Sequence, residues 1–186
     1  MKRLFIVFMV LSILEGCGFG QEALDSALLF RKKLLLAEKC DIVCEISADY
    51  GDEIHTFTLA CMTDRDGDVM FSVLEPESIS EISGRISTLG GSLTFDDAVL
   101  GFPLLVDNTL SPVSAPWILI NSLRNGYMVS CGKETDGMRL CVNDSYEDDA
   151  LVLDVWFDMY MTPRYAEIFW RGRRILTINI EKFEML

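Results

Sequence analysis

Side chains with the chemistry for catalysis are few in this sequence of 186 residues. His55 is the only histidine, so no His-Glu-x-x-His pair exists to hold a metal. There is no Gly-x-Ser-x-Gly elbow and no phosphate-binding loop. Paired carboxylates such as Asp96-Asp97 and Asp148-Asp149 occur, but an acidic surface produces them by default. We therefore expect a protein that is not an enzyme and that uses no cofactor or metal.

Two acidic segments have the clustered oxygens that calcium prefers. In Asp64-Arg65-Asp66-Gly67-Asp68 the glycine is misplaced for an EF-hand and no downstream glutamate completes the loop, which favours a hairpin turn. The segment 143–149 is expected to be a solvated acidic loop, with calcium or a basic partner as the alternative.

Six cysteines are present, and their spacing does not match a zinc site, because Cys40-x-x-x-Cys44 lacks a second compact Cys/His pair. The expected hairpins place Cys44 opposite Cys61 and Cys131 opposite Cys141. Buried free thiols are favoured at these positions, and cross-strand disulfides are the alternative.

The N-terminal segment has a positive start, an apolar middle and a cysteine at its end. Lys2 and Arg3 precede an apolar run from Leu4 to Leu14. A bilayer span needs about 20 apolar residues, so this shorter run predicts a cleaved secretory signal peptide instead.

The ending Leu14-Glu15-Gly16-Cys17 resembles the lipobox of bacterial lipoproteins, from which Glu15 is the one departure. The resemblance implies cleavage before Cys17 and lipidation of its sulfur. Residues 1–16 would then be the signal peptide, 17–21 a lipidated N-terminus and tether, and 22–186 one domain. Such a protein is extracytoplasmic and anchored to the outer face of a bacterial cell or spore membrane. A plain secreted protein and an uncleaved anchor are the alternatives.

The chain is strongly acidic, with a formal net charge of −13. Nucleic-acid binding needs clustered Lys and Arg, so we expect no nucleic-acid partner. The same charge repels anionic headgroups, and membrane attachment is therefore expected to rest on acyl chains. A basic protein partner remains permitted.

Strong helix formers without Gly or Pro predict a first helix over 21–39, whose apolar face would combine Leu24, Leu28, Phe30 and Leu35. Packing on a sheet is favoured over a membrane-surface helix. A second helix should begin at Ser114 as N-cap and stop at Asn125-Gly126.

Apolar residues alternate with polar ones from residue 41 onward, which predicts antiparallel hairpins. Between the two helices we expect a third strand ending at Pro76, two short strands near 79–86 and 92–95, and a loop or helical turn over 101–112. Strands at 151–161, 164–170 and 174–183 complete an α+β fold built on a large curved antiparallel sheet covered by two helices.

The supply of large apolar side chains exceeds what one exposed meander carries. The candidate ligand or partner face consists of Trp117, Ile120, Trp156, Phe169 and Trp170. Ordinary core packing is the alternative.

The lipobox, first helix, meander, inserted helix and the stretch from Ala166 to Phe183 resemble the LolA-like lipoprotein-carrier superfamily, and more narrowly the GerS-like lipoproteins of spore-forming Firmicutes. The resemblance implies a half-open β-barrel covered by helices. It also implies a lipid-anchored binding protein that holds or activates a protein partner, such as a spore cortex amidase of germination. A carrier or sensor of lipid or another apolar ligand in the concave cavity is the alternative.

Overall fold

The computed structural model describes residues 20–51, 53–96, 98–102, 105–106 and 109–186. The expected signal peptide, Cys17 and most of the expected tether lie outside the described residues. Two α-helices, α2 (Gln21–Leu36) and α3 (Ala115–Asn125), accompany the strands. The short 3-10 helices η1 (Glu77–Ile79) and η2 (Pro112–Ser114) lie between them in sequence.

Eleven strands form one antiparallel sheet in the order β6-β5-β4-β3-β2-β1-β13-β12-β11-β10-β9. Their bounds are β1 Cys40–Asp49, β2 Ile54–Thr63, β3 Val69–Glu75, β4 Ser83–Ser87, β5 Gly90–Phe95, β6 Ala98–Phe102, β9 Tyr127–Glu134, β10 Gly137–Asn143, β11 Leu151–Asp158, β12 Pro163–Trp170 and β13 Arg173–Met185. A separate pair consists of β7 Leu105–Val106 and β8 Thr109–Leu110.

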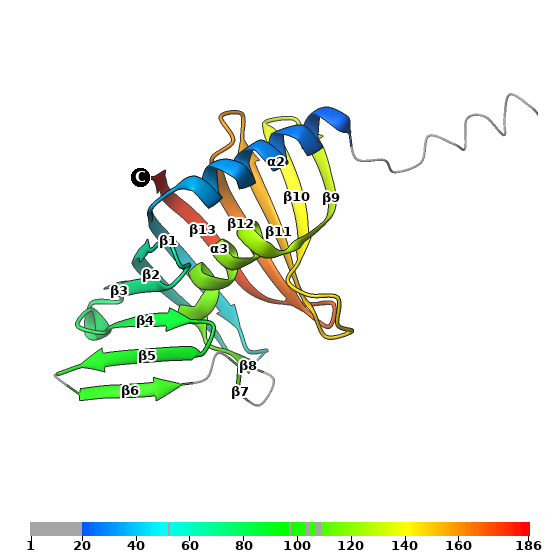
Figure 1. Cartoon of the computed structure of the whole chain (residues 1–186). Coiled ribbons are helices and arrows are strands. Elements are labelled where there is room, and N and C mark those ends of the chain that lie inside the picture. Colours follow the sequence, from blue (N-terminus) through cyan, green and yellow to red (C-terminus); the bar gives the residue numbers. More distant parts are fainter. Residues whose placement is uncertain (1–19, 52, 97, 103–104, 107–108) are drawn as a thin grey trace, which may run out of the picture.

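The sheet is curved and open, because β6 and β9 are its two ends (Figure 1). Its halves are joined where β1 pairs with β13, from Cys40 opposite Met185 onward. Both helices lie on the concave side (Figure 1). The structure therefore has the expected α+β class, a large curved antiparallel sheet with two covering helices.

Helix α2 buries a different face from the one that its leucines predicted. The residues that it buries are Ala23, Ala27, Phe30 and Leu34. Of the expected face, Phe30 is buried and Leu24 packs against the core, whereas Leu28 and Leu35 are 49% and 52% exposed, so the prediction was wrong for these two. The small alanines allow the helix to approach the sheet closely, and Phe30 packs edge-on against Phe157 with ring centroids 4.8 Å apart.

The helix ends are close to the predicted ones. Helix α2 ends at Leu36 rather than Lys39. Ser114 precedes α3 as expected but caps no helical N–H, because its hydroxyl donates to the carbonyl of Ser111 instead. Among the described residues, no helix has the length and apolar character to cross a bilayer.

The β1–β2 hairpin has a shifted register relative to the predicted one. Cys44 pairs with Leu59 and not with Cys61. The turn is tighter than expected, since the Tyr50 N–H donates to the Glu53 carbonyl at 3.1 Å. The shift is an even number of residues, so both thiols stay on the buried face.

The β9–β10 register also differs, with a larger consequence. Cys131 pairs with Leu140, the residue before Cys141. Glu134 pairs with Gly137, so only the two residues between them form the turn. A slip of one residue reverses the faces, so Cys131 and Cys141 lie on opposite sides of the sheet and the predicted thiol pair does not form.

The stretch 77–112 contains more strand than predicted, because β4, β5 and β6 all extend the sheet. Gly91 permits this pairing to be compact: any Cβ there would overlap the ring of Phe102, which covers it from β6. Beyond β10, the strands at the C-terminal end match their predicted positions within a few residues.

Candidate functional site

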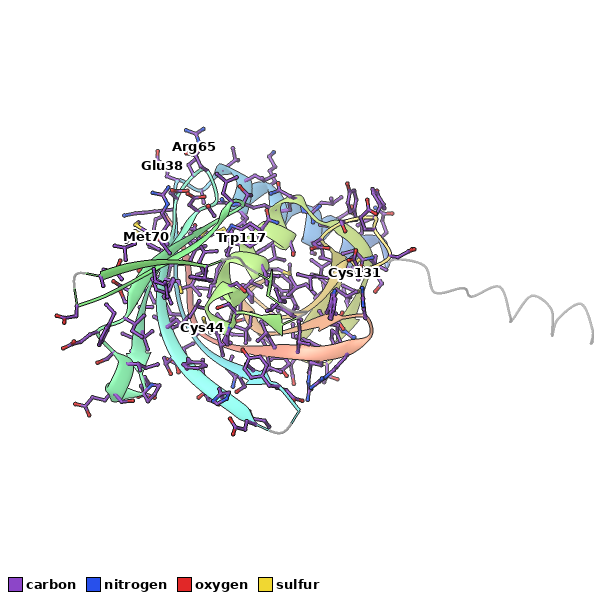
Figure 2. All side chains as sticks on the ribbon, turned by 90° about the horizontal axis from the view of Figure 1, so that it is seen from below. Glu38, Cys44, Arg65, Met70, Trp117 and Cys131 are labelled. Atoms are coloured by element: carbon purple, nitrogen blue, oxygen red, sulfur yellow. The ribbon has the colours of Figure 1, made fainter. Side chains whose placement is uncertain are left out.

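The concave side beneath α3 is filled by side chains. Helix α3 contributes four large apolar side chains that are at most 2% exposed: Ile118, Leu119, Ile120 and Leu123. They belong to one buried cluster with sheet residues such as Ile46 and Ile178. Figure 2 shows Trp117 on α3 within the curve of the sheet, and its half-buried ring packs against the same cluster. This part of the concavity is core.

The five predicted face residues do not converge on one site. Trp117 and Ile120 share α3, where Ile120 is fully buried in the core. Trp156, Phe169 and Trp170 are half-buried and do not pack against the core cluster. The structure therefore does not bring these five residues together on one surface.

The position of Trp156 follows from strand period. Val155 and Phe157, on either side of Trp156 in β11, are both buried on the concave side. Because successive side chains of a strand point to opposite faces, Trp156 lies on the convex side. There its ring lies 5.3 Å from that of Tyr165 and under the guanidinium of Arg139, 4.9 Å from the centroid. A cation–π contact of this kind stabilises the convex surface.

Beside it, the convex face holds one buried carboxylate. Asp154 is 5% exposed and its Oδ2 accepts a short hydrogen bond from Arg139 Nη2. Its Oδ1 has no hydrogen-bond partner among the described residues. Cys141 lies directly opposite on β10, where burial and then the charge of Asp154 raise the pKa of its thiol to about 11. The cluster keeps this thiol protonated at neutral pH.

The described cysteines are all free thiols, and the pKa of four of them is raised. The free thiols are Cys40, Cys44, Cys61, Cys131 and Cys141. Burial raises the pKa of Cys40 and of Cys131. The hydrogen bond that the Cys61 thiol donates to Cys44, followed by burial, raises the pKa of Cys61. A nucleophilic thiol needs the opposite shift. Cys40, Cys44, Cys61 and Cys131 are buried in the core, whereas Cys141 is half-buried on the convex face.

The acidic turn between β2 and β3 is a hairpin turn, as favoured from sequence. The Asp64 N–H donates to the Asp68 carbonyl at 3.0 Å. Arg85 binds the carboxylate of Asp68 and lies 3.6 Å from that of Asp64. No group of three metal-ligating side chains occurs among residues whose placement is described.

His55 lies near the β1–β2 turn with its side chain 46% exposed, 3.2 Å from Glu53. Its ring is 5.7 Å from that of Tyr50. These contacts are those of a surface residue, and His55 lines none of the grooves described below.

A groove of about 240 Å³ lies between one side of α2 and the sheet. Its lining comes from α2, the β11–β12 turn and β13, and includes Leu29, Phe30, Lys33, Tyr160, Met161 and Phe183. A larger depression of about 670 Å³ lies where β10 meets β11, and it is lined by polar and charged groups such as Glu134, Asp158 and Arg164. Neither contains a residue of α3.

The β5–β6 end of the sheet exposes apolar side chains. Phe95, Val99 and Leu100 are 50%, 71% and 66% exposed. Neither strand contains a charged residue. Among the described strands, β6 pairs only with β5, so the N–H and C=O groups of its outer edge have no strand partner. We call this surface the β6 edge.

Sequence analysis missed the β6 edge. The apolar stretch Ala98–Phe102 is its sequence signal, but a run this short cannot be separated from a loop by period alone.

No family model matches the sequence, and no curated protein matches it. Solved structures do match. A LolA superfamily protein from Nitrosomonas europaea has 9% identity, covers 86% of this chain and 93% of its own, and gives a TM-score of 0.48. An uncharacterized conserved protein from Thermus thermophilus has 10% identity over 89% and 86%, also at 0.48. The Mycobacterium tuberculosis lipoprotein LppX has 10% identity over 86% and 95%, at 0.38. Similarity at this level assigns the chain no ligand and no partner.

Proposed function

We propose that this chain is a non-enzymatic, extracytoplasmic binding protein, anchored through Cys17 to the outer face of a bacterial membrane, that holds a protein partner. The observation that carries the proposal is the β6 edge: an uncharged, apolar strand at the end of a large sheet, whose outer edge pairs with none of the described strands. Natural proteins normally protect such an edge with charge, proline or a covering segment.

Strand addition is the interaction that the β6 edge supports. An extended segment of a partner can pair with the free N–H and C=O groups of β6, which gives affinity without a deep pocket. Val99 and Leu100 point to opposite faces of the strand, so a partner can contact both. The filled interior beneath α3 favours this surface over an internal cargo site.

The absence of enzymatic activity is supported by the thiols and by His55. The pKa values of Cys40, Cys61, Cys131 and Cys141 are raised, which opposes thiolate formation. His55 is exposed and lines none of the grooves described above.

The resemblance to germination lipoproteins makes a cell-wall amidase the first partner to test. The full chain and a Val99→Lys variant would be produced in the same cells, and the amidase that co-purifies from solubilised membranes would be quantified. We expect Val99→Lys to lose most of the bound amidase. Val129→Lys is the matched control, because Val129 is 49% exposed on β9 at the opposite end of the sheet. Equal retention by all three chains would reject the β6 edge as the binding surface.

A carrier of an apolar ligand is the second candidate, and the groove between α2 and β13 favours it. At about 240 Å³ the groove is lined by the rings of Phe30 and Phe183 and by Met161 and Met185. That volume is below the usual range for small-molecule sites, so one acyl chain is the largest fitting ligand. Native mass spectrometry of the purified chain tests it: a bound lipid lost on Met161→Arg supports the carrier, and a ligand-free spectrum opposes it.

A further inference from the structure

The outward face of α2 is apolar as well as its buried face. Leu28, Leu29, Leu35 and Leu36 are 49%, 54%, 52% and 74% exposed. A surface helix of a soluble domain normally places polar residues there. Four exposed leucines within the last turns of one helix need an explanation beyond packing, since Ala23, Ala27, Phe30 and Leu34 already supply the packing.

Neighbouring segments extend this apolar face. Met159 and Tyr160, in the β11–β12 turn, are 71% and 82% exposed. The groove between α2 and β13 brings Tyr160 beside Leu29. The C-terminal Leu186 is 55% exposed, and its carbonyl accepts from the Glu38 N–H just after α2. Figure 1 shows α2, the β11–β12 turn and the C-terminus at the same end of the molecule. We call this end the α2 surface.

The C-terminal half of α2 is basic, although the chain carries a net charge of −13. Between Ser26 and Lys39 the sequence has four basic residues and one acidic residue. Lys32 and Lys33 are exposed, and no described carboxylate lies within ion-pair distance of either. Arg31 is engaged elsewhere, by a hydrogen bond to the Leu123 carbonyl.

The acidic residues at the other end of α2 have partners. Glu22 forms an ion pair with Lys133 at 2.6 Å. Asp25 accepts a hydrogen bond from the Gln21 amide at 2.9 Å. The Gln21 amide is neutral, so Asp25 keeps its negative charge, and Lys32 and Lys33 are the cations of the helix that have no described ion-pair partner.

The expected lipid anchor lies next to this surface in sequence. Cys17 precedes the first residue of α2, Gln21, by four positions. Four extended residues span at most about 14 Å. A lipidated Cys17 would hold Gln21, the first residue of α2, within that distance of the bilayer.

We propose that the α2 surface lies flat on the anionic bilayer that holds Cys17, with its leucines at the level of the headgroups and Lys32 and Lys33 on lipid phosphates. The inference rests on the proposed anchoring at Cys17. Exposed leucines flanked by lysines are the composition of helices that lie in a membrane interface, and tyrosine is enriched at the same depth. Attachment by one lipidated residue leaves a domain free to rotate; a second contact fixes its orientation. The β6 edge lies at the end away from α2 (Figure 1), so this orientation points it toward partners beyond the membrane.

Fluorescence quenching by brominated lipid tests the orientation in the full processed chain. The lipoprotein would be purified from membranes and reconstituted into phosphatidylglycerol–phosphatidylcholine vesicles, with or without bromine on the acyl chains. Leu36→Trp reports on the α2 surface. Leu89→Trp is the matched control, because Leu89 is 98% exposed in the β4–β5 turn. The three native tryptophans give a common background.

We expect Leu36→Trp to lose most of its added fluorescence in brominated vesicles, and Leu89→Trp to keep it. Adding Lys32→Glu and Lys33→Glu should reduce the quenching at residue 36, since both lysines are exposed and their loss leaves the fold intact. Flotation of the chain with the vesicles is measured in parallel. A chain that does not float overturns the anchoring and the inference together. A chain that floats without quenching at residue 36 overturns the inference alone, and shielding of that residue from aqueous iodide without lipid quenching would assign the surface to a protein instead.

Discussion

Arg31 Nε donates a hydrogen bond of 2.7 Å to the carbonyl of Leu123, which joins α2 to α3 across 92 positions of sequence. The acceptor is one of the last carbonyls of α3, where the helix dipole favours a positive charge. Burial lowers the pKa of Arg31, and its Nη2 has no hydrogen-bond partner among the described residues. This contact ties the two covering helices together on the concave side.

Arg31→Met is expected to destabilise the fold by about 1–2 kcal/mol. The substitution removes a hydrogen bond from a charged group, and this loss is partly offset because the unsatisfied buried Nη2 is removed as well. Urea unfolding followed by circular dichroism measures the change. Lys32→Met is the control, because Lys32 is exposed one residue further along α2 and should change stability by no more than about 0.5 kcal/mol. Equal stability of the two variants would show that the link between the helices contributes nothing.

The pair of Arg139 and Asp154 predicts a strong non-additivity. Asp154 is buried and Arg139 is its only ion-pair partner among the described residues, so Arg139→Met leaves a buried charge without a counter-charge. We expect a loss of roughly 2–4 kcal/mol, since removing one partner of a buried pair costs more than removing both.

Asp154→Asn combined with Arg139→Met should recover much of that loss. The double-mutant cycle, measured by urea unfolding at pH 7, gives the coupling directly. Arg164→Met is a suitable control, because it removes an arginine paired with a more exposed carboxylate, that of Asp158. Simple additivity of the two substitutions would contradict the pairing.

The elements of this fold were more predictable than their registers. The order of strands and helices could be predicted from the alternation of apolar residues and from the runs of helix-forming residues, and nearly all of the predicted elements are present in the structure. Register depends on single turn residues: Tyr50 and Glu53 close one hairpin tightly, and Gly137 closes another. In each hairpin the cysteines therefore pair with residues other than the predicted ones. The alternation of apolar and polar residues does not determine at which residue a turn closes.

The buried face of α2 was not predictable from hydrophobicity. Leucines occur all around the helix, and the choice of face is made by Ala23 and Ala27, whose small size fits the sheet. The exposed leucines became visible only once that choice was known. Trp156 failed as a predicted face residue for a related reason, because an apolar residue can lie on either face of a strand.

Gly137→Ala should disrupt the β9–β10 hairpin. Gly137 has a φ of 156°, and a Cβ there would overlap the carbonyl oxygen of Phe157 on β11. The atoms that the Cβ would meet belong to the backbone and not to the end of a flexible side chain, so the backbone of β10 or β11 must move. We expect a loss of about 3 kcal/mol or more, seen as a lower urea midpoint.

Gly132→Ala provides the comparison for that substitution. Gly132 lies in β9 of the same hairpin, and a Cβ built there meets nothing within 4 Å. It should leave stability unchanged or slightly higher, because alanine reduces the freedom of the unfolded chain. A similar midpoint for both variants would contradict the close approach at Gly137.

The raised pKa of Cys141 predicts a loss of stability in alkali. The folded protein holds this thiol protonated up to about pH 11, whereas its ordinary pKa is 9.0. The contribution is therefore fully present below pH 9 and is lost as the pH rises from 9 toward 11, because the unfolded chain releases the proton first. Cys141→Ala should lose less stability across this range than the unchanged protein, when both are melted in reductant at pH 8.5 and pH 10.5. Ser130→Ala removes a hydrogen bond that lowers the pKa of Cys141, so it should keep the alkaline loss or deepen it. A parallel pH dependence of all three chains would exclude Cys141 as its source.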